Sequence, residues 1–202
     1  SHSNAYLYGF WKNKRIVLYD TLLNEETIEK MKLFEQDPNH AEQKQSEVKR
    51  LGLTDNEVVS VLGHELGHWS LSHNLYNFII SEIHFFILMA AFSYFYKSKA
   101  IFEAFGFYDS TPTVIGIVIV FQFLAMPYEE LVGFLLTVLT RQMEFAADRF
   151  SGELGYGKDL SKALIKLGKD NLSLPVNDYL FSTFKHSHPT TLERIRALRK
   201  GE

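Results

Sequence analysis

The 202-residue chain has no cysteine, which excludes disulfide frameworks, cysteine-ligated zinc ribbons and catalysis by a thiol. Any metal ion must therefore be held by histidine, aspartate or glutamate. The chain also has no run of clustered lysine and arginine. Its basic and acidic residues are interspersed and its net charge is −3, so we expect no nucleic-acid partner. It begins Ser-His-Ser-Asn, with no initiator methionine and no signal peptide, and we expect it to be a piece of a longer protein.

Apolar residues make up 46% of the chain, which is enough for the core of one main domain. Near the N-terminus, residues 4–11 and 15–19 are rich in β-forming side chains and are separated by three polar residues. This pattern predicts a β-hairpin with an edge strand within residues 1–23. The other expected elements are helices, so the predicted fold is mainly α with a small β-sheet.

A polar segment separates this hairpin from the first expected helix. Residues 24–53 carry many charges and few apolar side chains, and we interpret them as a surface excursion. Thr54-Asp55-Asn56-Glu57 then has the Ser/Thr-x-x-Glu form of a capping box, and apolar residues follow it at helical spacing. A helix is therefore expected to begin near Asp55.

Two long apolar stretches, residues 75–96 and 113–139, each have about the 20 residues that one bilayer crossing needs. The alternative is a pair of buried core helices. We favour membrane-embedded helices because both stretches are apolar all round, and because aromatic residues and lysines gather at residues 94–99, as they do at an interface. Pro127 either kinks one long helix or lies near the start of a new one. Four polar side chains are then expected to face protein or a water-filled cavity: Glu82, His84, Glu129 and Glu130.

The sequence VLGHELGHW, residues 61–69, lies inside the helix expected from Asp55. His64 and His68 are four residues apart, so they share one helix face and can bind a single cation. Zinc in hydrolytic sites takes three protein ligands and leaves a position for water, whose proton Glu65 can accept and pass to the leaving amine. The alternative is two ordinary solvated or core histidines. We favour the zinc site because the full H-E-x-x-H pattern is uncommon by chance.

A glycine directly precedes each of the two histidines of this motif. Gly63 and Gly67 each cost about 1 kcal/mol relative to alanine in a helix interior. Another part of the molecule is therefore expected to approach the backbone of this helix closely.

A zinc site of this kind needs a third ligand. His73 lies more than a turn beyond His68, and His84 lies within an apolar stretch, which makes both poor candidates. Glu144 and Asp148, in the sequence EFAAD, are one helical turn apart. Glu144 could complete a His₂Glu site, and Asp148 could accept the outer N–H of a ligand histidine. The alternative is an ordinary surface pair. Two membrane crossings would return this carboxylate to the side of the histidines.

The last candidate residues lie in HSHPTTLERIRAL, residues 186–198. His188 and Arg194 could offer an imidazole and a guanidinium to a developing oxyanion or to a substrate carboxylate. The alternative is that Arg194 simply belongs to a basic terminal helix.

These motifs together resemble the type I CAAX prenyl proteases, integral-membrane gluzincin endopeptidases. The resemblance runs nearly end to end, through SNAYLYG, KRIVLYDTLL, VLGHELGHW, FGFYDSTPT, EFAAD and SHPTTLERIRAL. It implies a zincin-type metalloprotease domain combined with transmembrane helices, and one Zn²⁺ per chain on His64, His68 and Glu144. It also implies Glu65 as general base and Asp148 as a supporting aspartate.

The resemblance further implies how substrate binds. Asn4, on an edge strand, would bind the substrate backbone, which fits the addition of a peptide strand along residues 4–7. His188 and Arg194 would contact the substrate or its transition state. The expected partners are the lipid bilayer and farnesylated or geranylgeranylated CAAX proteins or peptides, from which the last three residues are removed.

The family resemblance also implies a location and a larger protein. Its members are multi-pass proteins of the endoplasmic reticulum membrane and the nuclear inner membrane. They have seven transmembrane helices, so residues 1–202 would be the catalytic region of a longer chain. Two alternatives remain open: a membrane quality-control zinc protease of related fold, and a non-catalytic membrane scaffold with a structural zinc.

Overall fold

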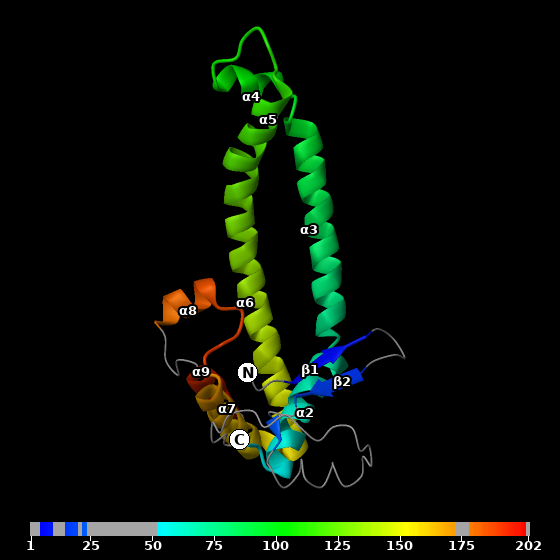
Figure 1. Cartoon of the computed structure of the whole chain (residues 1–202), viewed down its shortest axis with the longest axis vertical. Helices are drawn as coiled ribbons and strands as arrows, with labels where there is room; N and C mark the ends of the chain where they lie inside the picture. Colours follow the sequence, from blue (N-terminus) through cyan, green and yellow to red (C-terminus); the bar gives the residue numbers. More distant parts are fainter. Residues whose placement is uncertain (1–4, 10–14, 20–21, 24–51, 173–177, 201–202) are drawn as a thin grey trace, which may run out of the picture.

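The computed structural model describes residues 5–9, 15–19, 22–23, 52–172 and 178–200. A long antiparallel helical hairpin stands on a smaller helical base (Figure 1). The fold is mainly helical with a two-stranded sheet, as predicted. In chain order the elements are β1 (Ala5–Tyr8), β2 (Arg15–Leu18), α2 (Asp55–Ser70), α3 (His73–Phe95), α4 (Lys99–Ala104), α5 (Thr113–Ile119), the π-helical η2 (Val120–Ala125), α6 (Met126–Ser151), η3 (Gly152–Tyr156), α7 (Gly157–Asp170), α8 (Tyr179–Lys185) and α9 (Thr191–Lys200).

Strands β1 and β2 pair antiparallel, with Ala5 opposite Leu18. They lie within the two β-rich runs of the sequence and form the small sheet beside α2. Two of the sequence predictions, for Asn4 and for the polar segment, concern residues 4 and 24–51, which lie outside the described residues.

Helix α2 begins at Asp55, where the capping box predicts it. The Thr54 backbone N–H donates to Oε2 of Glu57 over 2.7 Å, which satisfies one of the donors that a helix start leaves without a partner. Lys166 of α7 donates to the same oxygen over 2.6 Å. The Glu57 side chain is buried, so one carboxylate both caps α2 and ties it to α7.

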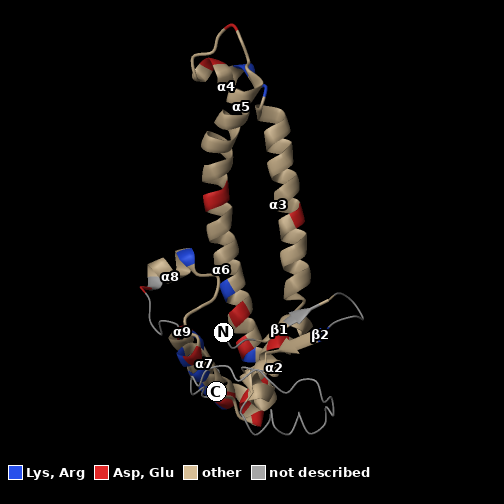
Figure 2. Cartoon of the chain, in the orientation of Figure 1, with Lys and Arg blue, Asp and Glu red and all other residues tan. Residues whose placement is uncertain are grey.

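The hairpin consists of α3 and of the continuous helix α5–η2–α6, joined at its far end by α4 (Figure 1). Both helices are long and apolar enough to cross a membrane. Their apolar side chains point outward: Phe86 is 66% exposed and Val114 is 73% exposed. Figure 2 shows charged residues gathered in the base and around α4, with isolated acidic bands along the hairpin. An apolar exterior of this kind suits lipid rather than water.

Pro127 lies within one continuous helix as the second residue of α6, two residues after the end of the π-helical segment η2. A proline has no N–H to donate to the preceding turn, and a π-helical turn is a common way to absorb such an interruption. The proline therefore leaves α5 and α6 on one path, and this path returns the chain to the base.

In the base, α2 packs against the last turns of α6 through its two glycines. A Cβ on Gly67 would lie 3.0 Å from the Ala147 Cα and 3.1 Å from its carbonyl oxygen, and one on Gly63 would lie 3.0 Å from the Ser151 Oγ. Ser151 in turn donates to the Ser60 carbonyl over 2.8 Å. This close approach accounts for the glycines, and it places α6 directly beside the histidine face of α2.

Candidate metal centre and active site

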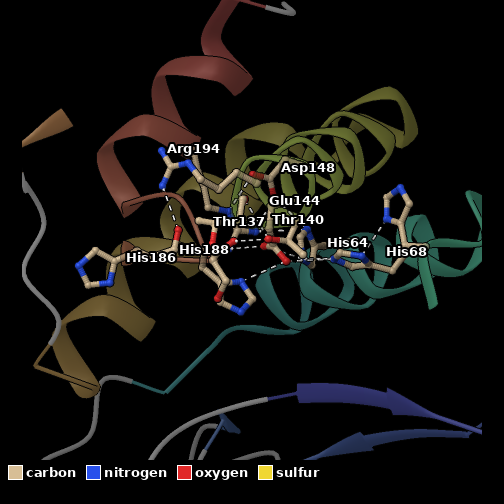
Figure 3. Close-up of polar contacts among 12 residues, drawn as sticks. His64, His68, Thr137, Thr140, Glu144, Asp148, His186, His188 and Arg194 are labelled. Carbon is tan, nitrogen blue, oxygen red and sulfur yellow. Dashed lines mark hydrogen bonds and ion pairs between the residues drawn. The ribbon is translucent and has the colours of Figure 1, made fainter. Parts of the chain in front are cut away.

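Three side chains from α2 and α6 converge in the base (Figure 3). The Nε2 atoms of His64 and His68 lie 3.2 Å apart. Glu144 places Oε2 at 3.7 Å from the His64 Nε2 and Oε1 at 3.4 Å from the His68 Nε2. In a tetrahedral site with zinc–ligand bonds of about 2.0–2.1 Å, neighbouring ligand atoms are about 3.3 Å apart. The three donors therefore have the spacing of a zinc site.

The outer ring nitrogens of both histidines have partners of their own. The His64 Nδ1 lies 2.9 Å from Oδ1 of the buried Asp148, and the His68 Nδ1 lies 2.9 Å from the Nδ1 of His73. A histidine that donates from Nδ1 has its lone pair on Nε2, which is the form that binds a metal. Burial lowers the pKa of His64, which further favours the neutral, metal-binding ring. The donor set fits zinc.

Arg194 of α9 closes one side of this site. Its Nε and one terminal nitrogen donate to the two oxygens of Asp148 over 2.8 and 2.6 Å, and its other terminal nitrogen lies 3.4 Å from Oε2 of Glu144. A bidentate pair of this kind fixes the carboxylate as well as neutralising it. Arg194 therefore links the ligand Glu144 to Asp148, the hydrogen-bond acceptor of His64.

Glu65 lies in the same cavity as the three donors. The side chain is half-buried, and burial raises the pKa of its carboxyl above the ordinary value, with the Glu144 carboxylate adding to this effect. A carboxylate whose pKa moves toward neutrality is a better general base. The geometry thus supplies a proton acceptor beside the metal ligands.

His188 contacts the third donor from the segment between α8 and α9. Its Nδ1 is 3.2 Å from Oε1 of Glu144, and its side chain is 73% exposed. The hydrogen bond to Glu144 raises the pKa of His188, so this ring is more readily protonated than an ordinary histidine. An exposed imidazole with this property can donate a hydrogen bond to an oxygen that gains negative charge.

A cavity of about 660 Å³ joins these groups. Glu65, Glu144 and His188 line it together with Ala5 and Tyr6 of β1. The small sheet therefore lies at the rim of the metal site, where an extended peptide could run.

Arg141 of α6 holds the segment that carries His188. Its guanidinium donates to Oγ of Ser182 in α8 over 3.1 Å and to Oε1 of Glu193 in α9 over 2.7 Å. The second oxygen of Glu193 accepts the Thr190 backbone N–H over 2.7 Å at the start of α9. One buried arginine thus ties both helices that flank His188 to α6.

The sequence model of Peptidase family M48 matches residues 1–202. The chain belongs to peptidase family M48. It is 51% identical to the human CAAX prenyl protease 1 homolog over 98% of the chain and 44% of that protein. It is 49% identical to the Caenorhabditis elegans homolog over 98% of the chain and 45% of that protein.

A solved structure also matches. The crystal structure of S. mikatae Ste24p superposes with a TM-score of 0.70 at 34% sequence identity, covering 98% of this chain and 42% of that one. The chain thus spans less than half the length of the relatives it matches. The M48 membership and the donor geometry together identify His64, His68 and Glu144 as the zinc site.

The structure of this M48 chain brings four other predicted site residues close to the zinc ligands. Glu65, Asp148, His188 and Arg194 all lie within the site or in contact with its donors, and their roles stay predictions. Arg194, predicted to bind substrate, has both Asp148 and Glu144 as partners. The Asn4 prediction falls outside the described residues.

The sequence alone did not indicate two residues that support the site, His73 and Arg141. The position of His73, more than a turn beyond His68, makes it a poor ligand candidate, yet its ring contacts the outer nitrogen of His68. Arg141 gave no local signal, because its partners Ser182 and Glu193 lie more than 40 residues away. The contact between His73 and His68 depends on the end of α2 at Ser70, and a helix end predicted at this position would have indicated it.

Proposed function

We propose that the protein containing this chain is a zinc-dependent endopeptidase that removes the last three residues of prenylated CAAX proteins. The observation that carries the proposal is the convergence of His64, His68 and Glu144 beside Glu65 in one cavity. The relatives named CAAX prenyl protease 1 homolog, at up to 51% identity over nearly the whole chain, support the substrate class.

The catalytic roles follow from the positions of the side chains. Zinc held by His64, His68 and Glu144 would supply Lewis-acid activation of water and of the scissile carbonyl. Glu65 accepts the proton of the attacking water and then delivers it to the leaving amine. His188 donates a hydrogen bond to the carbonyl oxygen as negative charge develops there.

Substrate binding is proposed to use the rim of the cavity. A peptide laid beside β1 would receive main-chain hydrogen bonds in a fixed register, and we propose Asn4, which precedes Ala5 in the sequence, as one donor or acceptor. Ala5 and Tyr6 line the cavity, which supports this path. Arg194 lines the same cavity, where it can stabilise the C-terminal carboxylate of the substrate.

The lipid and the location are also part of the proposal. The apolar hairpin of α3 and α5–η2–α6 provides the membrane setting in which a farnesyl or geranylgeranyl group can partition. We propose that the protein is a multi-pass protein of the endoplasmic reticulum membrane and the nuclear inner membrane, as the family resemblance implies.

The test uses the purified full-length protein with two matched peptides that differ only in prenylation of the cysteine. We expect cleavage of the prenylated peptide alone, and a loss of at least about 100-fold with Glu65→Gln while zinc content stays the same. Equal cleavage of the unprenylated peptide would instead favour a quality-control protease. Zinc binding without any peptidase activity would favour a scaffold.

A further inference from the structure

We propose that His73 is the positioning residue of the zinc ligand His68. The Nδ1 atoms of the two rings lie 2.9 Å apart, and the rings meet nearly edge to face at 75°. His73 is buried, at 6% exposure. The proposal rests on the zinc site but not on the identity of the substrate.

The contact determines which nitrogen of His73 carries the proton. The His68 Nε2 faces His64 and Glu144 at 3.2 and 3.4 Å, so that nitrogen is the metal-binding one and its Nδ1 must carry the N–H. This N–H can be donated only if the His73 Nδ1 offers a lone pair. His73 is therefore the neutral tautomer protonated at Nε2, and it acts as an acceptor.

His73 cannot be a ligand from this position. It contacts the nitrogen of His68 that points away from Glu144, on the outer side of the ring. Among the described residues, the group of donors that can share one ion consists of His64, His68 and Glu144. The role left to His73 is to orient His68 and to raise the basicity of its ligating nitrogen.

The two zinc-binding histidines are thus held in different ways. His64 donates to the carboxylate of Asp148, whereas His68 donates to an uncharged imidazole. An ionic acceptor strengthens the hydrogen bond and the ligand more than a neutral one does. Because His73 is uncharged, the His68 hydrogen bond adds no further negative charge to a site that already contains Glu65, Glu144 and Asp148.

The chain path makes this contact possible. On a continuous helix, residues five apart point in different directions. Here α2 ends at Ser70, Ser72 takes a left-handed conformation with φ of 56°, and α3 begins at His73. The break turns the His73 ring back onto His68. The first residue of the hairpin helix α3 therefore orients a metal ligand in α2.

The test compares two amide substitutions in the full-length protein. The side-chain oxygen of asparagine occupies the place of histidine Nδ1, whereas that of glutamine reaches the place of Nε2. We expect His73→Asn to keep the zinc dissociation constant within about threefold, and His73→Gln to raise it about 10-fold to 100-fold. Zinc affinity is measured by competition with a chelator, and His68 geometry by the visible absorption spectrum of the cobalt-substituted protein.

The control removes another histidine from the same helix. His84 lies on α3 and contacts Tyr128 and Glu129, far from the zinc donors, so His84→Gln should leave zinc affinity and the cobalt spectrum unchanged. Wild-type affinity in His73→Gln, or equal losses in His73→Gln and His73→Asn, would overturn the proposal. Zinc binding is measured without substrate, so failure to cleave a prenylated peptide would not affect this result.

Discussion

Gly67 of α2 lies so close to Ala147 of α6 that a methyl group on the glycine would come within 3.0 Å of the Ala147 Cα. This contact involves backbone atoms, which cannot rotate away as a side chain can. The two helices therefore meet at a distance that only glycine allows. The same contact sets how far Glu144 lies from His64 and His68.

We predict that Gly67→Ala separates α2 from α6 and weakens the zinc site. Forcing a methyl group into this contact should lower the free energy of unfolding by about 1–3 kcal/mol and raise the zinc dissociation constant. Thermal unfolding and chelator competition measure the two effects. The matched control is Gly133→Ala in α6, the helix against which Gly67 packs, because an added Cβ at Gly133 meets nothing within 4 Å. Equal behaviour of the two variants would contradict the packing argument.

Replacing the proposed third ligand should remove the metal. Glu144→Ala deletes one of three donors, and we expect the purified protein to retain little zinc and to lose peptidase activity. Metal analysis by mass spectrometry checks this directly. Zinc retained at full affinity in Glu144→Ala would show that another residue is the third ligand.

Asp148→Asn tests the hydrogen bond between Asp148 and the Nδ1 of the zinc ligand His64. The substitution keeps the shape of the side chain but removes the charge that pairs with Arg194 and polarises His64. We expect zinc to bind about 10-fold to 100-fold more weakly, and the protein to unfold more easily because the buried Arg194 guanidinium loses one of its two charged partners. Asp159→Asn is the control, because Asp159 pairs with the exposed Lys162 within α7. Unchanged zinc affinity in Asp148→Asn would argue against a supporting role.

The Glu57–Lys166 pair should make stability depend on pH. Burial raises the pKa of Glu57, but the hydrogen bonds from Lys166 and Thr54 together outweigh it, so the pKa is lowered. A carboxyl whose pKa is lower in the folded chain stabilises the fold at pH values above its ordinary pKa, and this contribution is lost as the pH falls.

We therefore expect the unfolding temperature of wild type to exceed that of Glu57→Gln at pH 7, and the difference to shrink as the pH falls below about 4.5. Thermal unfolding of both proteins across this range provides the measurement. A difference that is constant with pH would mean that Glu57 acts through packing alone.

Local patterns were sufficient for several parts of this structure. The capping box at Thr54 predicted the start of α2, and the length and apolarity of two stretches predicted the helices of the hairpin. Helical periodicity placed His64 and His68 on one face, because residues four apart are neighbours on any helix. Family resemblance then named Glu144, some eighty residues away.

The short helices α4 and α8 were not predicted. α8 covers Tyr179–Lys185, and its position is set by Arg141 of α6 through Ser182. Such a helix has too few residues to show an amphipathic pattern, and its stability comes from contacts that are distant in sequence.

The sequence by itself determined that His64 and His68 can bind one zinc ion, because donor chemistry and helical spacing are local properties of the chain. Only the tertiary structure decided the acceptor of each ligand histidine: Asp148 for His64, and His73 for His68. The first depends on the close packing of α2 against α6, and the second on the left-handed turn at Ser72. Periodicity tells which side chains share a face, but it does not tell which faces meet.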